Sequence, residues 1–119
     1  MKDKNQTDLG AIKIHKQVIA SVAKHAALEV EGVKTVGKKF EMFIHEILGI
    51  EKILSGIKID IEKNEDVKIE IGIIVKYGHK VSEVASNVQD NILKMAEKML
   101  DINLKEVNVN ILGIEKEDK

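Results

Sequence analysis

The stretch GIKIDIEKNEDVKIEIGIIVKY, residues 56–77, alternates apolar and polar side chains on both sides of a polar turn. Apolar residues occupy every second position of 56–62 and again of 67–77. A period of two is typical of half-buried β-strands. The polar residues 63–66 lie between the two runs, so the stretch is predicted to form a β-hairpin.

The charges of this stretch predict the register of the hairpin. If position 61 faces position 67, Asp60 faces Lys68 and Lys58 faces Glu70. A shift by two residues sets Asp60 against Glu70 or Lys58 against Lys68, and like charges directly opposite each other destabilise a sheet. A slip by one residue turns the isoleucines to the wrong face. We therefore predict the first register.

Helical periodicity appears on both sides of the hairpin. Residues 16–31 are predicted to form a helix that ends at Gly32, a residue that favours left-handed backbone. Residues 81–99 predict a longer helix, with Ser82 and Glu83 at its start, where capping and acidic residues are favoured. The predicted core stripes are Ile19, Val22, Ala23, Ala26, Ala27 and Val30 in the first helix, and Val81, Val84, Ala85, Val88, Ile92, Met95, Ala96 and Met99 in the second.

The remaining segments complete the predicted order. Residues 10–14 and 107–111 alternate as strands, residues 33–36 are a short strand or an extended connection, and residues 38–55 are an extra amphipathic helix. The result is the α+β, ferredoxin-like split βαβ order in a single domain, residues 10–114, with two helices on one sheet face. Residues 1–9 and 115–119 are predicted to be flexible tails. The other sheet face is predicted to carry Lys58, Asp60, Glu62, Lys68, Glu70, Asn108 and Asn110.

Composition limits the possible functions. The chain has 119 residues and no cysteine, so disulfides and thiolate chemistry are excluded. Its only aromatic residues are Phe40, Phe43 and Tyr77, which predicts an aliphatic core. The net charge is −1 and all 19 basic residues are lysine. Without the planar fork of arginine, such a surface is a poor binder of phosphate backbones.

No catalytic, cofactor or metal motif is present. The four histidines, His15, His25, His45 and His79, lack the short ligand spacings of metal sites, so surface positions are expected for them. The sequence has no GxSxG elbow, no GxGxxG and no P-loop. We therefore expect no enzyme activity, no cofactor and no metal.

Nucleic-acid binding is not expected either, because the open sheet face lacks stacking aromatics and carries mixed charges. A small regulatory module that binds RNA or a metabolite stays open as an alternative. Residues 1–8 contain no apolar segment of a signal peptide, and no apolar run approaches the ~20 residues that span a bilayer. A cytoplasmic protein without direct membrane insertion is expected.

Several short blocks resemble one bacterial family. They are GAIKI at 10–14, EVEGV at 29–33, GIKI at 56–59, Tyr77-Gly78, and EVNV at 106–109 followed by Gly113-Ile114. In this order they are similar to the alkaline shock protein family, general or envelope stress proteins of mostly Gram-positive bacteria. The sequence departs from the family at Asn110, where histidine is frequent, and at Asp101, where glycine is frequent.

The resemblance implies a non-enzymatic protein of stress response and cell envelope homeostasis, without catalytic residues. It also implies a homo-oligomer that acts through protein–protein interaction, held at the membrane by a separate membrane-anchored partner in some members. Residues 38–55 have no clear counterpart in the family. Their apolar stripe is the candidate interaction surface, with packing inside the chain as the open alternative. The stripe consists of Phe40, Phe43, Ile44, Ile47 and Leu48.

Overall fold

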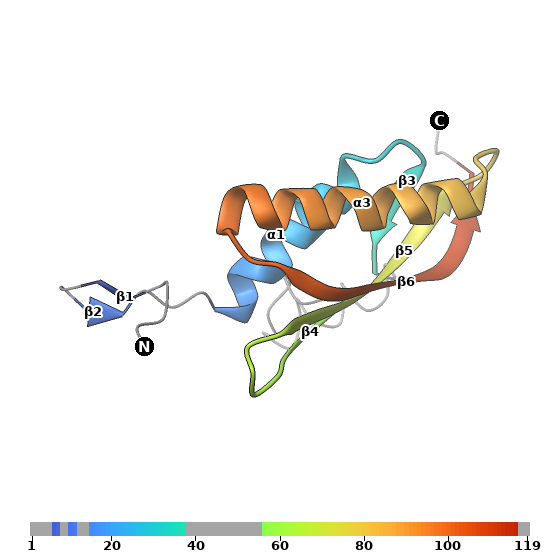
Figure 1. The fold of residues 1–119 in the computed structure, drawn as a ribbon. Coiled ribbons are helices and arrows are strands. Elements are labelled where there is room, and N and C mark those ends of the chain that lie inside the picture. The colour runs from blue at the N-terminus through green and yellow to red at the C-terminus, as the bar shows by residue number, and fades with distance from the viewer. Residues whose placement is uncertain (1–5, 8–9, 12–14, 38–55, 117–119) are drawn as a thin grey trace, which may run out of the picture.

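The strand β5 (Val67–Lys76) is the centre of the main sheet, and the other three strands of this sheet all pair with it. The computed structural model describes residues 6–7, 10–11, 15–37 and 56–116. Antiparallel to β5 run β3 (Val33–Val36) and β4 (Ile57–Ile61). Parallel to β5 runs β6 (Leu104–Glu115), so the sheet is mixed (Figure 1).

Three glycines show how β3 and β4 share β5. The amide of Gly72 donates to the oxygen of Gly56, and the oxygen of Gly72 accepts from the amide of Gly37, both at 2.8 Å. The N–H and C=O of one strand residue point to the same side. Both β3 and β4 therefore lie on one edge of β5, end to end, and β6 lies on the other.

The predicted hairpin register is confirmed. Asp60 lies opposite Lys68, and Lys58 lies opposite Glu70, as the charge argument requires. The turn is closed by the amide of Glu62, which donates to the oxygen of Asp66 at 2.8 Å.

Two helices pack side by side over one face of the sheet, α1 (Lys16–Leu28) over β3 and β4, and α3 (Val81–Leu100) over β6 (Figure 1). Alanines at 20, 23, 26 and 27 are buried in α1, and such small side chains allow close approach of its backbone. The Asn91 side chain of α3 donates to the backbone oxygen of Ala26 in α1 at 2.7 Å, which joins the two helices. The largest fully buried side chains are Ile69, Ile71, Ile73, Ile92, Val36, Val75 and Val88.

The predicted α+β class is confirmed, but the first strand has a different partner. Gly10–Ala11, named β2, pairs with β1 (Gln6–Thr7) in a separate two-stranded sheet that lies apart from the main one (Figure 1). The predicted tail 1–9 thus contains a short strand. Residues 33–36, for which two predictions were open, form a strand.

Several predicted boundaries were wrong. Because α1 ends at Leu28, Gly32 lies in the turn after the helix, with the left-handed φ of 101° that was expected of it. The N-cap of α3 is Lys80 and not Ser82, although Glu83 does lie in the first turn. Met99, predicted to be part of the core stripe, is 59% exposed and lines a groove beside α1. The last strand extends from 104 to 115 and so includes the first residue of the predicted C-terminal tail.

Candidate interaction surfaces

The surface predicted from sequence lies outside the described residues. Phe40, Phe43, Ile44, Ile47 and Leu48 all belong to 38–55, so their role stays a prediction. Four other surfaces can be built from the described part of the chain: the open sheet face, a groove and a cleft in the helix layer, and the outer edge of β6.

The open sheet face carries ion pairs at the hairpin end. The ammonium of Lys68 lies 3.0 Å from the Glu62 carboxylate, and Lys105 lies 3.6 Å from both Glu62 and Asp66. The hydrogen bond from Lys68, and the charges of Lys68 and Lys105, hold the pKa of the Glu62 carboxyl below its usual value. The same hydrogen bond raises the pKa of Lys68. This face therefore has neutralised charges and no aromatic side chain among its described residues.

Toward the far end of β5 the same face becomes apolar. Ile74 is only 5% exposed, although its strand neighbours point to the opposite, helix-covered face. Next to it Leu112 lies over Gly72, where an added Cβ would meet the Leu112 Cδ1 at 2.7 Å. The sequence prediction of a fully polar face missed this apolar part. The available signal was the run of apolar residues at 73–75, which breaks the alternation.

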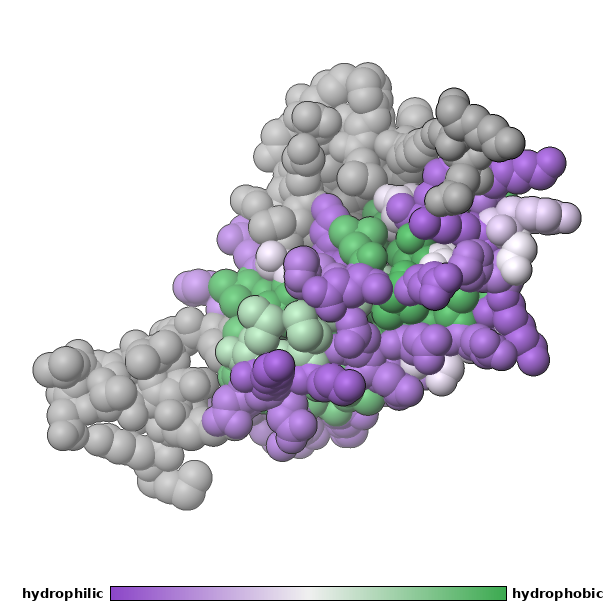
Figure 2. Space-filling model, turned by 90° about the horizontal axis from the view of Figure 1, so that it is seen from above, coloured by the Kyte–Doolittle hydropathy of each residue, from purple (hydrophilic) through white to green (hydrophobic). Residues whose placement is uncertain are grey.

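A shallow groove of about 300 Å³ lies on the helix layer. Ser21, Val22 and His25 of α1 and Met99 of α3 line it, and Val18 nearby in α1 is 43% exposed. Figure 2 shows apolar side chains gathered in separate groups over this face, with hydrophilic side chains between them. The groove offers apolar contact area at Val22 and Met99, beside the polar side chains of Ser21 and His25.

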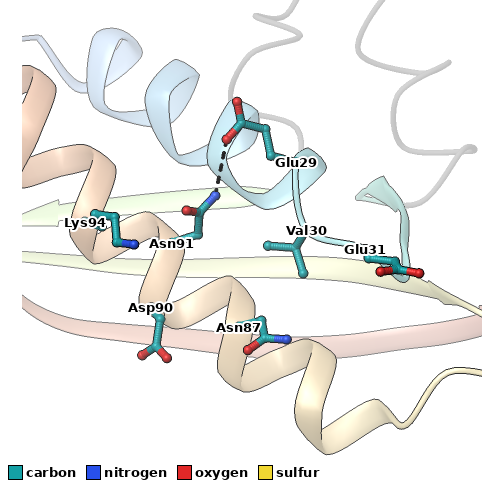
Figure 3. A pocket seen from close by; sticks show the side chains of 7 residues that line it. All are labelled: Glu29, Val30, Glu31, Asn87, Asp90, Asn91 and Lys94. Carbon is teal, nitrogen blue, oxygen red and sulfur yellow. Dashed lines mark hydrogen bonds between the residues drawn. The ribbon is translucent and has the colours of Figure 1, made fainter.

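A polar cleft of about 450 Å³ lies between the end of α1 and the middle of α3. Figure 3 shows Glu29 and Asn91 turned toward each other, at 3.5 Å, while Asp90 is directed away from them. The carboxylates of the cleft therefore do not converge on one point, which a cation site requires. Its lining residues are Glu29, Val30, Glu31, Asn87, Asp90, Asn91 and Lys94.

Neither hollow assembles a metal site. Within the described ranges, no three His, Cys, Asp or Glu side chains come close enough to hold an ion. His25, one of the four histidines of the sequence, instead pairs with Glu29 at 3.0 Å on the surface of α1. No described helix is both long enough and apolar enough to cross a bilayer.

The outer edge of β6 is the fourth surface. Over the part of the chain that the structure describes, β6 pairs with β5 alone, so its other edge carries no strand. The side chain of Gln89 in α3 donates to the backbone oxygen of Val107 at 2.9 Å. Ile111 and Ile114 of β6 are 37% and 52% exposed.

Comparison with known proteins assigns the chain to a family. The family model of alkaline shock protein 23, described as having a cell envelope-related function, matches residues 4–116. The chain belongs to this family. Its relatives include the uncharacterized Bacillus subtilis proteins YqhY, 31% identical over 98% of this chain and 86% of the relative, and YloU, 32% identical over 92% of each. The resemblance inferred from the short sequence blocks is thereby confirmed.

Solved structures of the MamM CTD share the fold. One variant superposes with a TM-score of 0.55 at 16% identity, over 83% of this chain and 98% of that one. Other MamM CTD structures are copper, cadmium and nickel forms, and these metals belong to those proteins. At this identity the likeness supports the α+β fold and nothing about metals in this chain.

The two departures from the family pattern have structural consequences. Asp101 is the C-cap of α3 and has a left-handed backbone, with φ 55° and ψ 41°, which fits the frequent glycine at this position. Asn110 lies on the open sheet face and donates to the carboxylate of Glu70 at 3.0 Å. Neither residue lines the groove or the cleft described above.

Proposed function

We propose that this member of the family acts without catalysis, in the cytoplasm, by self-association and by binding a membrane-anchored protein partner. Its task in this proposal is the maintenance of the cell envelope under stress. The envelope-related family gives the setting. The proposed mode of action rests on one observation: several large apolar side chains are exposed on the helix layer and on β6.

These apolar side chains are not scattered singly. Val18, Val22 and Met99 gather around the groove between α1 and α3, and Ile111 and Ile114 follow one another along β6. Exposed apolar side chains that lie in groups on a small domain are typical of sites where proteins bind one another. Polar residues that could act in catalysis are instead engaged in pairs, such as Glu62 with Lys68 and His25 with Glu29.

Sedimentation with membranes tests the proposal. The purified full-length protein is mixed with membranes of the native organism, with the same membranes after protease treatment, and with protein-free vesicles of the extracted lipids. We expect the protein to sediment with the untreated membranes only. Equal binding to the lipid vesicles would show direct lipid contact, and failure to bind any membrane would overturn the partner part of the proposal.

A further inference from the structure

Among the described residues, no strand pairs with the outer edge of β6, and residues 107–114 of the strand lack the charged residues that mark the opposite edge of the sheet. A strand edge without a partner is a template for another strand, and natural proteins usually protect it with charged residues. The short edge strand β4 carries Lys58 and Asp60. In β6, by contrast, residues 107–114, VNVNILGI, contain no charge, although the chain as a whole is 33% charged.

The direction of the backbone groups on this edge follows from one hydrogen bond. Gln89 of α3 reaches the oxygen of Val107, whose carbonyl therefore points away from β5. Backbone groups alternate along a strand, so Val109 and Ile111 present their N–H and C=O to the same outer edge. The bulge against β5 falls after Ile111, which leaves 106–111 regular.

The flank of α3 beside this edge is also uncharged. Gln89 marks the side of the helix that faces β6, and residues at helical spacing from it lie on the same side. From Ser82 to Leu93 the exposed residues of this row are Ser82, Ser86, Gln89 and Leu93, with Leu93 at 41%, and the row reaches a charged residue only at Glu97. Edge and flank together form one continuous uncharged surface, which we name the β6 edge surface: residues 107–111 with Ser82, Ser86, Gln89 and Leu93.

The sequence of the edge is complementary to itself. Valine–asparagine alternation in 107–111 reads the same in both directions about Val109, apart from isoleucine in place of the last valine. A two-fold interface brings a patch against its own copy, so each residue must suit its mirror position. We infer that the β6 edge surface pairs antiparallel with the β6 of a second copy, about a two-fold axis at Val109. This inference rests on the self-association in the proposed function and names its surface.

Over residues 107–111 the axis at Val109 matches side chains on both faces of the joined sheet, while one position further out Glu106 faces the partner's Leu112. Val109 faces its own copy, Val107 faces the partner's Ile111, and Asn108 faces the partner's Asn110. Moving the axis to Asn110 sets Asn108 against Leu112, and moving it to Asn108 sets Lys105 against Ile111. The pairing adds about six backbone hydrogen bonds, two for each outward-facing residue pair. Gln89 is no obstacle, because a carbonyl oxygen accepts two hydrogen bonds.

Charge pairs placed at the two asparagines test both the surface and the register. Asn108 and Asn110 are exposed, so their substitution leaves the core unchanged. Asn108→Lys with Asn110→Lys sets like charges opposite each other twice across the axis. Asn108→Lys with Asn110→Glu sets opposite charges there, and it differs from the first variant at one position only. Sedimentation equilibrium of the full chain at low ionic strength measures dimerisation, and thermal unfolding checks that both variants fold.

We expect a dimer for the natural sequence, dimerisation about ten-fold weaker or more for the like-charge variant, and recovery for the opposite-charge variant. Equal dimerisation of the natural and like-charge proteins would overturn the pairing at this edge, while self-association itself would stand. A natural protein that stays monomeric at hundreds of micromolar would overturn the self-association in the proposed function as well. If the opposite-charge variant dimerises no more tightly than the like-charge variant, the proposed register is wrong.

Discussion

Gly37, which follows β3, and Gly56, which precedes β4, touch each other beside β5. A Cβ added to Gly56 would lie 2.6 Å from the Cα of Gly37, which is closer than real Cβ atoms approach a backbone. Both glycines have a φ of 78° and both bond to Gly72. The chain thus leaves the sheet after β3 and returns to it for β4 at one point beside β5.

This contact predicts the effect of Gly56→Ala. The new methyl group meets backbone atoms that cannot rotate away, and alanine is strained at positive φ. We expect a loss of about 3 kcal/mol or more in the free energy of unfolding, measured by urea denaturation. Gly78→Ala is the matched control, because φ is 98° there but no atom lies within 4 Å of the added Cβ. Gly78→Ala should lower the free energy of unfolding only by the strain of its left-handed backbone, about 1–2 kcal/mol. Equal losses of stability in the two variants would contradict the steric argument.

Local sequence carries enough information for the hairpin and the helices, but not for their assembly. The register of β4 against β5 follows from Lys58 and Glu70, because opposed charges act over neighbouring strands. The parallel pairing of β5 with β6 joins segments separated by a helix, and the alternation of Val107 and Val109 does not name a partner strand. The strand at 10–14 shows the same limit, since its described part pairs with 6–7 instead.

The candidate sites were predicted less completely than the fold. The groove at Val22 and Met99 arises where two helices cross, and a helical period alone placed Met99 in the core. Ile74 is buried on the face that the alternation assigns to polar residues, and alternation within one strand does not show which distant segments cover a face. The uncharged run at 107–114 is visible in the sequence, but its meaning depends on β6 being an edge strand.

Charge reversal tests the energetic role of the hairpin register. Lys58→Glu sets two carboxylates opposite each other, and we expect it to destabilise the fold by about 0.2–1 kcal/mol. Adding Glu70→Lys restores an opposite pair and should recover part of the loss. A double-mutant cycle on urea unfolding measures the coupling, and additive effects of the two substitutions would contradict a direct interaction between these positions.

The Glu62 carboxylate predicts a dependence of stability on acid. Its pKa is lowered in the folded state, so its contribution is present above the unfolded pKa and is lost as the pH falls through the folded one. Glu62→Gln should therefore reduce the slope of unfolding free energy against pH in the acid range. Because Glu62 and Lys68 are about a third exposed, added salt should also reduce the slope. An unchanged slope in the variant would show that other carboxylates cause the acid sensitivity.

Nucleic acids should not bind at physiological salt. The open face carries Lys58 and Lys68 opposite Glu70 and Asp60, with no arginine in the chain and no aromatic side chain among its described residues. A filter-binding assay with single-stranded RNA and duplex DNA checks this directly. Submicromolar affinity with a steep dependence on salt would contradict the prediction and would favour the alternative of a small regulatory module.

The role of residues 38–55 is tested by two serines on their apolar stripe. Phe43→Ser with Ile47→Ser removes large apolar side chains from the candidate interaction surface. We expect the variant to keep its melting temperature and its dimer but to lose sedimentation with native membranes, because the stripe is predicted to contact the partner. Lys38→Ser with His45→Ser places two serines on the opposite side of the predicted helix and should leave binding unchanged. A large fall in the stability of the Phe43 and Ile47 variant would instead assign the stripe to the protein's own core, where burial of such side chains contributes about 1.5–3 kcal/mol each.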